Sequence, residues 1–302
     1  MPLRSHSLPA LRIDAPARPA WRRAARRLLG HRGLSIGAAL VALAVLAALF
    51  APWLAPHDPY GQDLTRRLLP PAWDAARGNW AYPLGTDKLG RDYLSRLLFG
   101  ARVSLVIGVA AAALSGVIGT TLGVLAGYFG GRVDAAISYL ITTRLAMPVV
   151  LVALAMSSLL GGSLATVIVL LGLLLWDRFA VVSRSIAQQL RDAEFIAAAK
   201  AVGASTPYIL LRELLPNVSG ALIVVATLEM AHAILLEATL SFLGLGVPAP
   251  MPSWGLMIAE GKAYMFFQPW VILIPGAALA ITVLAINLVG DGVRDLSSPE
   301  GR

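Results

Sequence analysis

The chain has 302 residues, of which 57% are hydrophobic and only 14% are charged, and its mean hydropathy is +0.72. Soluble domains carry about 25% charged residues around one core, so this composition excludes an ordinary soluble protein and indicates a chain that lies mostly in a bilayer. The absence of cysteine excludes disulfides, thiol catalysis and thiolate metal sites. The net charge of +8 is typical of basic loops at a membrane surface, and we expect no nucleic acid as partner.

The first predicted membrane span is the uncharged stretch 34–54, which is long enough to cross the hydrocarbon core as a helix. A basic tail, residues 1–33, precedes it, and its paired arginines at 22–23 and 26–27 resemble a twin-arginine export signal or a secretory leader. A leader has an apolar run of about 7–15 residues, whereas this run is longer and further hydrophobic segments follow. We therefore predict an uncleaved anchor.

The second predicted span covers residues 103–129 and carries no formal charge. Small residues recur in it at strict four-residue spacing, so they share one face of the helix. Small side chains allow two backbones to approach closely in lipid, where packing drives the association of helices. We predict that this face packs against another helix through Ser115, Gly119, Gly123 and Gly127.

Residues 135–176 contain a single charge, Arg144, and Gly161–Gly162–Ser163 divides them into a third and a fourth span. The fourth must extend past Asp177 and Arg178 towards Val182 to be long enough to cross, which would put this pair near an interface. We expect Arg144 to snorkel to the inner interface or to pair with a neighbouring carboxylate.

A fifth span covers about 218–243 and a sixth lies within 270–288. The fifth contains Glu229, His232 and Glu237, and ionisable groups inside a membrane span are functional candidates. A metal site or proton relay is one interpretation, and pairing within the helix bundle is the favoured one, because the chain has four histidines and no second ligand pair. These three residues and Arg144 are the candidate pathway residues.

These spans predict an all-α integral membrane protein with six transmembrane helices. The segments on the side of the amino terminus hold sixteen basic residues and those on the other side hold eight, so the positive-inside rule places both termini in the cytoplasm. The predicted organisation is a cytoplasmic tail 1–33, a first helix 34–54, an extracytoplasmic segment 55–102, a five-helix core 103–290 with a cytoplasmic loop 184–217, and a cytoplasmic tail 291–302.

The sequence contains no clear motif for a nucleotide, metal or catalytic site. Residues 85–92, G-T-D-K-L-G-R-D, share the two-glycine spacing of a phosphate-binding loop, but Arg91 and Asp92 stand where that loop needs a lysine and a hydroxyl residue. We therefore predict no nucleotide site, no metal site and no catalytic residue, and we expect that the chain is not an enzyme.

The cytoplasmic loop 184–217 is the most informative polar segment. Its pattern predicts a helix over 194–202, a left-handed stop at Gly203, a cap at Ser205, and a second helix 208–215 that Pro207 begins and Pro216 ends. Such a helical hairpin is suited to docking on another protein, but by itself it is equally a mere connector.

This loop resembles the cytoplasmic motif of the permease subunits of ABC importers. The E-A-A triplet, the glycine and the I-x-L-P of that motif match Ala197-Ala198-Ala199, Gly203 and residues 213–216, E-L-L-P. Ala197 replaces the usual glutamate and Glu213 the usual isoleucine. Longer stretches resemble the dipeptide, oligopeptide and nickel branch, DppC/OppC type: 84–105, 127–134, 234–255 and 287–295.

The resemblance implies a type I, MetI-like permease in the bacterial inner membrane that imports peptides, most simply dipeptides. Oligopeptides, nickel chelates and glutathione remain alternatives. It further implies a second permease of the DppB/OppB type, two ATPases of the DppD and DppF type that use ATP and magnesium, and an extracytoplasmic solute-binding protein that meets residues 55–102 and 244–268. This chain would bind no cofactor. The implied ATPase-docking residues are Glu194, Ala197, Ala198, Ala199, Gly203, Ala204, Leu215 and Pro216.

Two other classes stay open beside the ABC permease. An ion-coupled secondary transporter would need no ATPase and would show internal repeats, or broken helices around an ion site at the midplane of the membrane. An intramembrane enzyme or receptor is the third class, and the lack of paired catalytic groups argues against it. The motifs favour the ABC permease.

Overall fold

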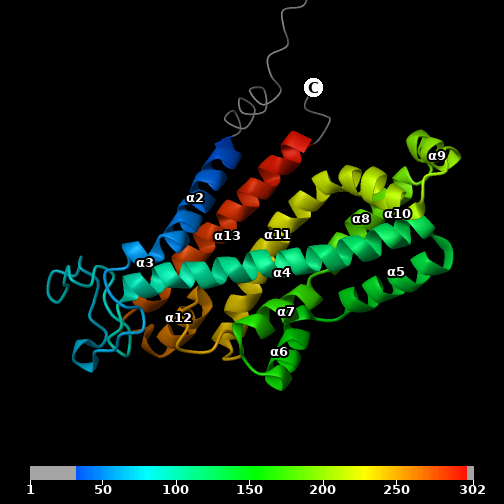
Figure 1. The fold of residues 1–302 in the computed structure, drawn as a ribbon. Helices are drawn as coiled ribbons and strands as arrows, with labels where there is room; N and C mark the ends of the chain where they lie inside the picture. Colours follow the sequence, from blue (N-terminus) through cyan, green and yellow to red (C-terminus); the bar gives the residue numbers. More distant parts are fainter. Residues whose placement is uncertain (1–31, 298–302) are drawn as a thin grey trace, which may run out of the picture.

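The computed structural model describes residues 32–297, and this part of the chain is built from helices (Figure 1). The longest are α2 (Arg32–Leu49), α4 (Tyr93–Phe129), α11 (Leu215–Phe242) and α13 (Trp270–Ser297). The shorter ones are α3 (Ala51–Leu54), η1 (Leu64–Arg66), α5 (Gly131–Ala146), α6 (Val149–Leu160), α7 (Leu164–Leu174), α8 (Asp177–Leu190), α9 (Glu194–Ala201), α10 (Thr206–Tyr208), η2 (Ile209–Leu214), α12 (Trp254–Gly261) and η3 (Lys262–Tyr264). Most of the predicted basic tail, with its paired arginines, and residues 298–302 lie outside the described range.

The expected all-α fold with six spans is confirmed. Five helical stretches within residues 32–297 are long and apolar enough to cross a membrane, and the bent pair α5–α6 makes a sixth. The five stretches are 32–49, 93–129, 164–190, 206–242 and 270–296. The fourth span extends past Asp177 and Arg178 as expected, because α7 and α8 together form it.

The third span is broken, which the hydrophobic pattern did not reveal. Its two halves, α5 and α6, meet at 88° across Met147 and Pro148. A proline disfavours helical backbone at the preceding residue, and Met147 is accordingly extended. Pro148 itself lacks the N–H that would continue the helix. A sharp bend near the middle of the span is the result.

Helix α4 begins at Tyr93, ten residues before the predicted start of the second span, so the end of the segment 55–102 is helical. The Asp92 side chain caps the helix by accepting a hydrogen bond from the Ser95 backbone N–H at 2.9 Å. The sequence pattern missed this start because the first turns of α4 carry charged residues, and charge was taken to exclude a membrane helix.

The small-residue face of α4 lies against α8. A Cβ added to Gly119 would lie 2.1 Å from the Trp176 carbonyl oxygen, and one added to Gly127 would lie 2.6 Å from the Arg184 carbonyl oxygen. Such distances leave room only for hydrogen, so glycine permits the close approach of the two backbones. Ser115 is buried on the same face and donates a hydrogen bond to the Ala112 carbonyl within its own helix.

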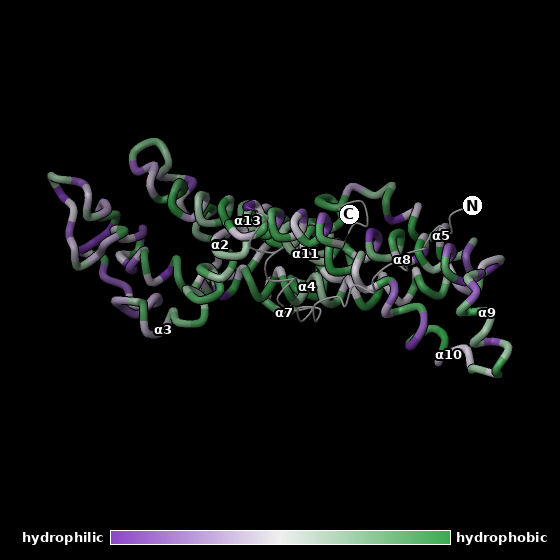
Figure 2. The backbone as a smooth tube through the Cα atoms, turned by 90° about the horizontal axis from the view of Figure 1, so that it is seen from above, coloured by the Kyte–Doolittle hydropathy of each residue, from purple (hydrophilic) through white to green (hydrophobic). Residues whose placement is uncertain are grey.

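Helices α2 and α13 lie side by side, and α13 also packs along α11 (Figure 1). Gly37 on α2 brings the backbone close to Ala285, and Gly292 on α13 does the same beside Leu34. Figure 2 shows hydrophobic residues along the middle of the molecule, whereas hydrophilic residues gather at its two ends, the segment before α4 and the region of α9 and α10. This distribution is the one that a membrane-spanning bundle requires.

The loop between α8 and α11 departs from its prediction in two details. Gly203 has φ +84°, which confirms the left-handed stop after α9. Ser205 occupies the cap position of α10, but its side chain makes no capping hydrogen bond, so the predicted cap is wrong. Pro216 does not end the second helix either, because residues 206–242 form one continuous span.

The reason is the π-helical turn η2 that precedes Pro216. Within it the Leu215 N–H donates to the carbonyl of Leu210, five residues back rather than four. The wider turn makes room for the ring of Pro216, which has no N–H, so the helix continues through this position into α11.

Candidate functional site

The loop predicted to dock on an ATPase forms one end of the molecule, where α9 projects from the bundle (Figure 1). A small cluster of buried residues holds it in place: Ile196 of α9, Ile209 and Leu214 of η2, and Val124 of α4. Ala199 and Ala204 pack against this cluster from the side. The loop is therefore anchored to α4 rather than loose.

The outer surface of this loop is exposed and mainly apolar, with Glu194 and Lys200 as exposed charges on α9. Ala197, Ala198 and Gly203 are exposed, as is Glu194 at the start of α9, while Leu215 is half-buried and Pro216 exposed. Beside them Val202 is 86% exposed. Exposed apolar patches at the polar end of a membrane protein are typical of protein–protein contacts, so the surface favours docking over a mere connector.

Three ionisable side chains of the spans meet, and one of them was not expected. The Nη1 atom of Arg178 on α8 lies 3.0 Å from Oε1 of Glu229 on α11, and Nδ1 of His232 lies 3.4 Å from the other oxygen of Glu229. Arg178 was placed near an interface by its sequence position, but it lies in the middle of the fourth span. The favoured interpretation of Glu229 and His232, pairing within the bundle, agrees with this geometry. Within residues 32–297 no group of three or more histidine or acidic side chains is arranged to hold a metal ion.

Glu237, the third acidic candidate on α11, lies apart from this trio. It is fully buried, and its Oε1 accepts hydrogen bonds from the hydroxyls of Ser241 at 2.7 Å and Ser253 at 2.8 Å. Ser253 also caps α12 by accepting from the Leu256 N–H. Glu237 therefore ties the loop before α12 to α11, and its pathway role stays a prediction.

Arg144 pairs with no carboxylate within residues 32–297, so that expectation is wrong, whereas its snorkelling to the inner interface stays a prediction. Its Nη2 donates to the carbonyl oxygen of Leu174, the last residue of α7. The last carbonyls of a helix have no partner within the helix and carry partial negative charge, which a guanidinium complements. Arg144 thus joins the bent third span to the interruption between α7 and α8.

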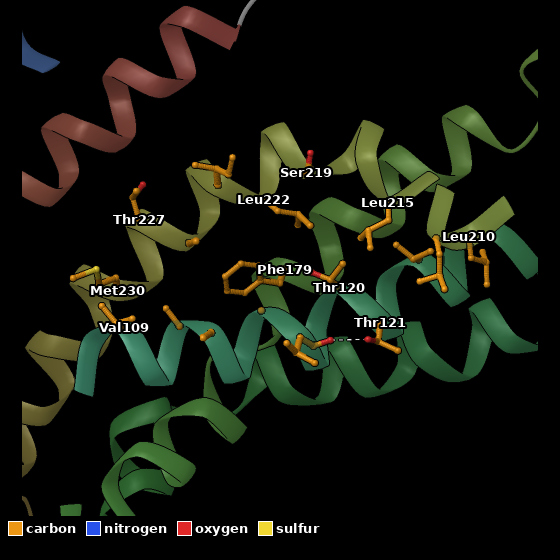
Figure 3. A pocket seen from close by; sticks show the side chains of 18 of the residues that line it. Val109, Thr120, Thr121, Phe179, Leu210, Leu215, Ser219, Leu222, Thr227 and Met230 are labelled. Carbon is orange, nitrogen blue, oxygen red and sulfur yellow. Dashed lines mark hydrogen bonds between the residues drawn. The ribbon is translucent and has the colours of Figure 1, made fainter. Parts of the chain in front are cut away.

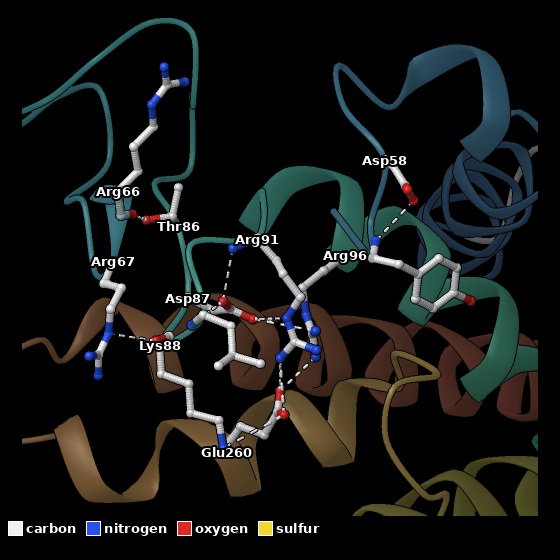
Figure 4. A network of polar contacts seen from close by, with 11 residues as sticks. Asp58, Arg66, Arg67, Thr86, Asp87, Lys88, Arg91, Arg96 and Glu260 are labelled. Carbon is white, nitrogen blue, oxygen red and sulfur yellow. Dashed lines mark hydrogen bonds and ion pairs between the residues drawn. The ribbon is translucent and has the colours of Figure 1, made fainter. Parts of the chain in front are cut away.

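The segment 55–102 and α12 share a buried ionic network that sequence reasoning missed (Figure 4). Nε of Arg91 lies 2.6 Å from Oδ2 of Asp87, and Nη2 of Arg91 lies 3.0 Å from Oε2 of Glu260 on α12. Nη2 of Arg96 on α4 lies 2.6 Å from the same oxygen of Glu260, and Nη1 lies 3.3 Å from Asp87. Lys88 reaches the rim of the network at 3.8 Å.

This network explains the stretch that resembles a phosphate-binding loop. Arg91 and Arg96 are fully buried, so their charges need these partners. Gly90 has φ +74° and lies so close to the Asp63 carbonyl that a Cβ would meet it at 1.8 Å. The two glycines therefore let residues 85–90 fold closely against Asp63 and Leu69 of the same segment. A pairing of charged residues within 87–96 was the available signal, but nothing in the sequence indicated Glu260.

A large apolar groove of about 850 Å³ lies between α4 and α11 (Figure 3). Val109 and Thr120 line it from α4, Leu222 and Met230 line it from α11, and Phe179 of α8 lies between them. Sequence reasoning did not find it, because most of the lining residues are apolar and typical of a lipid-facing helix.

Comparison with protein families gives two matches. Residues 119–301 match the model described as binding-protein-dependent transport system inner membrane component. Residues 20–71 match the N-terminal TM domain of oligopeptide transport permease C. The second range includes the first span, and the first range runs from within α4 through the last span.

Curated relatives match over nearly the whole chain. A putative peptide transport system permease protein of Brucella abortus is 40% identical, covering 91% of this chain and 90% of the relative. The di/tripeptide transport system permease protein DppC of Pseudomonas aeruginosa is 38% identical, covering 97% and 95%. The dipeptide transport system permease protein DppC of Haemophilus influenzae is also 38% identical, covering 89% and 91%.

A solved structure supports the fold. The inward-facing MetNI methionine ABC transporter contains a chain that is similar with a TM-score of 0.55 and 21% identity, covering 67% of this chain and 97% of the other. A second crystal form of the same transporter gives a TM-score of 0.51. At this identity the likeness concerns the fold alone.

Proposed function

This chain belongs to the family of binding-protein-dependent transport system inner membrane components, and from that membership we propose that it forms one half of the translocation pathway of an ATP-driven peptide importer. It is a multi-pass membrane protein with a MetI-type fold. The relatives named as peptide and dipeptide permeases support peptides as the substrate, with dipeptides first. Oligopeptides, nickel chelates and glutathione are the alternatives within the same proposal.

The observation that carries the proposal is the exposed apolar surface of α9, held on the end of α4 by a buried cluster. We propose that this surface docks on one of two ATPases of the DppD and DppF type, which bind ATP and magnesium. This chain then supplies no nucleotide site and no cofactor. Because α9 and α11 are linked through η2, a movement of the ATPase acts directly on a membrane span.

At the opposite end, the extracytoplasmic segment presents large exposed aromatic side chains. Trp53, Trp73 and Trp80 are exposed, and so are Phe266 and Phe267 after α12. Aromatic side chains are enriched where proteins bind one another, so we propose that this end receives a loaded solute-binding protein. Both termini are then cytoplasmic, and the second half of the pathway is a permease of the DppB/OppB type.

The broken third span and the charged trio are the features expected of an ion-coupled transporter, so the test must separate the two mechanisms. The tagged chain is purified from its native membrane in mild detergent, and its partners are identified by mass spectrometry. We expect two ATPases and a second permease. A chain that purifies alone, while a known ABC transporter of the same membrane keeps its subunits, contradicts the proposal.

A further inference from the structure

The trio of Arg178, Glu229 and His232 lies inside two membrane spans. In the continuous span 206–242, Glu229 is thirteen residues, or about 20 Å, from Phe242 and twenty-three residues from Thr206. Arg178 lies in the middle of the fourth span, 164–190. At this depth every charge needs a polar partner, because acyl chains provide none.

The burial of the trio is uneven. Glu229 has 1% of its side chain exposed and His232 has 33%, whereas Arg178 has 55% exposed. A half-exposed guanidinium at the midplane cannot face lipid without a cost of several kcal/mol. The face on which Arg178 stands is therefore covered by water or protein in the working transporter.

Other polar side chains continue this face along both helices. On α8, Ser185 and Gln189 are exposed seven and eleven residues after Arg178, which places them on the same side of the helix. On α11, exposed Thr239 follows His232 by seven residues. Polar side chains thus recur on this face on both sides of the trio, with the exposed apolar residues Val181 and Leu235 between them.

Two interruptions of the helices lie beside the trio. The α7 helix ends at Leu174 and α8 starts at Asp177, directly before Arg178. Arg144 donates to the Leu174 carbonyl there and sits next to the bend at Pro148. Discontinuous helices at mid-depth are a common setting for substrate sites in transporters.

We propose that Arg178 is a transient subsite for the carboxylate group of a peptide on its way through the membrane, and that Glu229 holds it in position. This assignment rests on the proposed function. A guanidinium has five N–H donors, and Glu229 occupies Nη1, which leaves an exposed edge for two parallel hydrogen bonds to a carboxylate. The buried Glu229 also offsets the positive charge, so the substrate is attracted without being retained, as conduction requires. The peptide ammonium finds no comparable partner here, since Glu229 is inaccessible.

The test uses the complete transporter in proteoliposomes, with saturating binding protein loaded with a radiolabelled dipeptide. Removal of the charge in Arg178→Gln is expected to lower transport roughly tenfold, the effect of one charge-assisted hydrogen bond. ATP hydrolysis stimulated by the binding protein is expected to fall less than about twofold, because the docking surface is intact. Arg178→Lys keeps the charge and is expected to restore much of the transport. Arg132→Gln, an exposed arginine at the start of α5, is the matched control and is expected to transport normally.

A second variant separates recognition from folding. Arg178→Gln alone leaves Glu229 buried and unpaired, whereas the double variant Arg178→Gln/Glu229→Gln removes both charges. If the subsite is real, the double variant is as slow as the single one. Recovered transport in the double variant overturns the proposal, because it assigns the loss to the unpaired carboxylate.

A dipeptide that carries a photoreactive group beside its carboxylate gives the direct readout with Arg178 intact. During turnover it is expected to label this chain next to Arg178. Labelling of the second permease alone overturns the subsite and makes Arg178 a contact between permeases. Transport by the wild-type protein is measured before any variant. If the wild-type transporter moves no peptide, the proposed function is wrong, and this result is distinct from failure of the subsite.

Discussion

Nη2 of Arg96 lies 2.6 Å from Oε2 of Glu260, a residue 164 positions further along the chain. Both side chains are largely buried, and Arg91 shares the same carboxylate. With Arg91, the pair joins the segment between α3 and α4 to α4 and α12, so this segment is fastened to the helix bundle. The surface that we propose to receive a binding protein gains rigidity from it.

The first prediction concerns this network. Glu260→Gln leaves two buried arginines with one carboxylate, and breaking a buried ion pair costs about 3–5 kcal/mol. We expect a clear fall in the thermal unfolding temperature in detergent and faster proteolysis within 55–92. Lys88→Gln is the control, since Lys88 is more exposed and lies 3.8 Å away, where an ion pair contributes about 1 kcal/mol or less. Equal unfolding temperatures and proteolysis rates of Glu260→Gln and Lys88→Gln would contradict a stabilising role of the network.

The second prediction concerns Gly203. A Cβ at this position meets no atom within 4 Å, so any effect of substitution comes from the backbone, whose φ of +84° strains a β-branched residue. Gly203→Val is expected to leave membrane insertion intact and to lower the ATPase activity that loaded binding protein stimulates. Gly203→Asn, which tolerates the left-handed region, is expected to retain most of that stimulation. Unchanged stimulation in Gly203→Val counts against the docking role of the loop.

The third prediction concerns the contact between α4 and α8. In Gly123→Ala the new Cβ lies 2.4 Å from the Ala180 carbonyl oxygen, so the helices must separate, which costs about 1–3 kcal/mol. Gly116 lies on α4 but outside the small-residue face. In Gly116→Ala the new Cβ lies 3.4 Å from the Phe179 ring, which is an ordinary contact distance. Both changes gain the same helix propensity. A lower unfolding temperature is therefore expected for Gly123→Ala only, and similar values for both would argue against close packing.

The fourth prediction concerns Ser253, which caps α12 and donates to the buried Glu237. Ser253→Ala removes both contacts, and loss of a cap alone costs about 1 kcal/mol. We expect a lower unfolding temperature and weaker stimulation by binding protein, because α12 carries Glu260. Ser158→Ala is the control, since this exposed hydroxyl bonds only to the Ala155 carbonyl of its own helix. If Ser253→Ala is as stable as Ser158→Ala, the contacts of Ser253 with Glu237 and α12 do not stabilise the protein.

Local patterns predicted the parts of the fold that depend on a few neighbouring residues. The four-residue spacing of Gly119 and Gly123 indicated a packing face, because one helix turn suffices to define it. Gly203 indicated a left-handed stop for the same reason. The number of spans followed from hydropathy alone.

The remainder depends on partners that are distant in sequence. Arg96 finds Glu260 only through the tertiary fold, and Arg144 takes a backbone carbonyl, which no side-chain pattern encodes. Pro216 was read as a helix end because a proline clashes in an α-helix, but the π-turn before it removes the clash. Arg178 was placed near an interface because the apolar stretch before it, which forms α7, is short.

The central claim is that this chain moves peptides with energy from ATP. The most direct test places the complete transporter in proteoliposomes with loaded binding protein and measures uptake of a labelled dipeptide, with and without ATP and with ionophores that dissipate proton and sodium gradients. The account predicts uptake that requires ATP and is unchanged by the ionophores. Uptake that proceeds without ATP and collapses with an ionophore would contradict it.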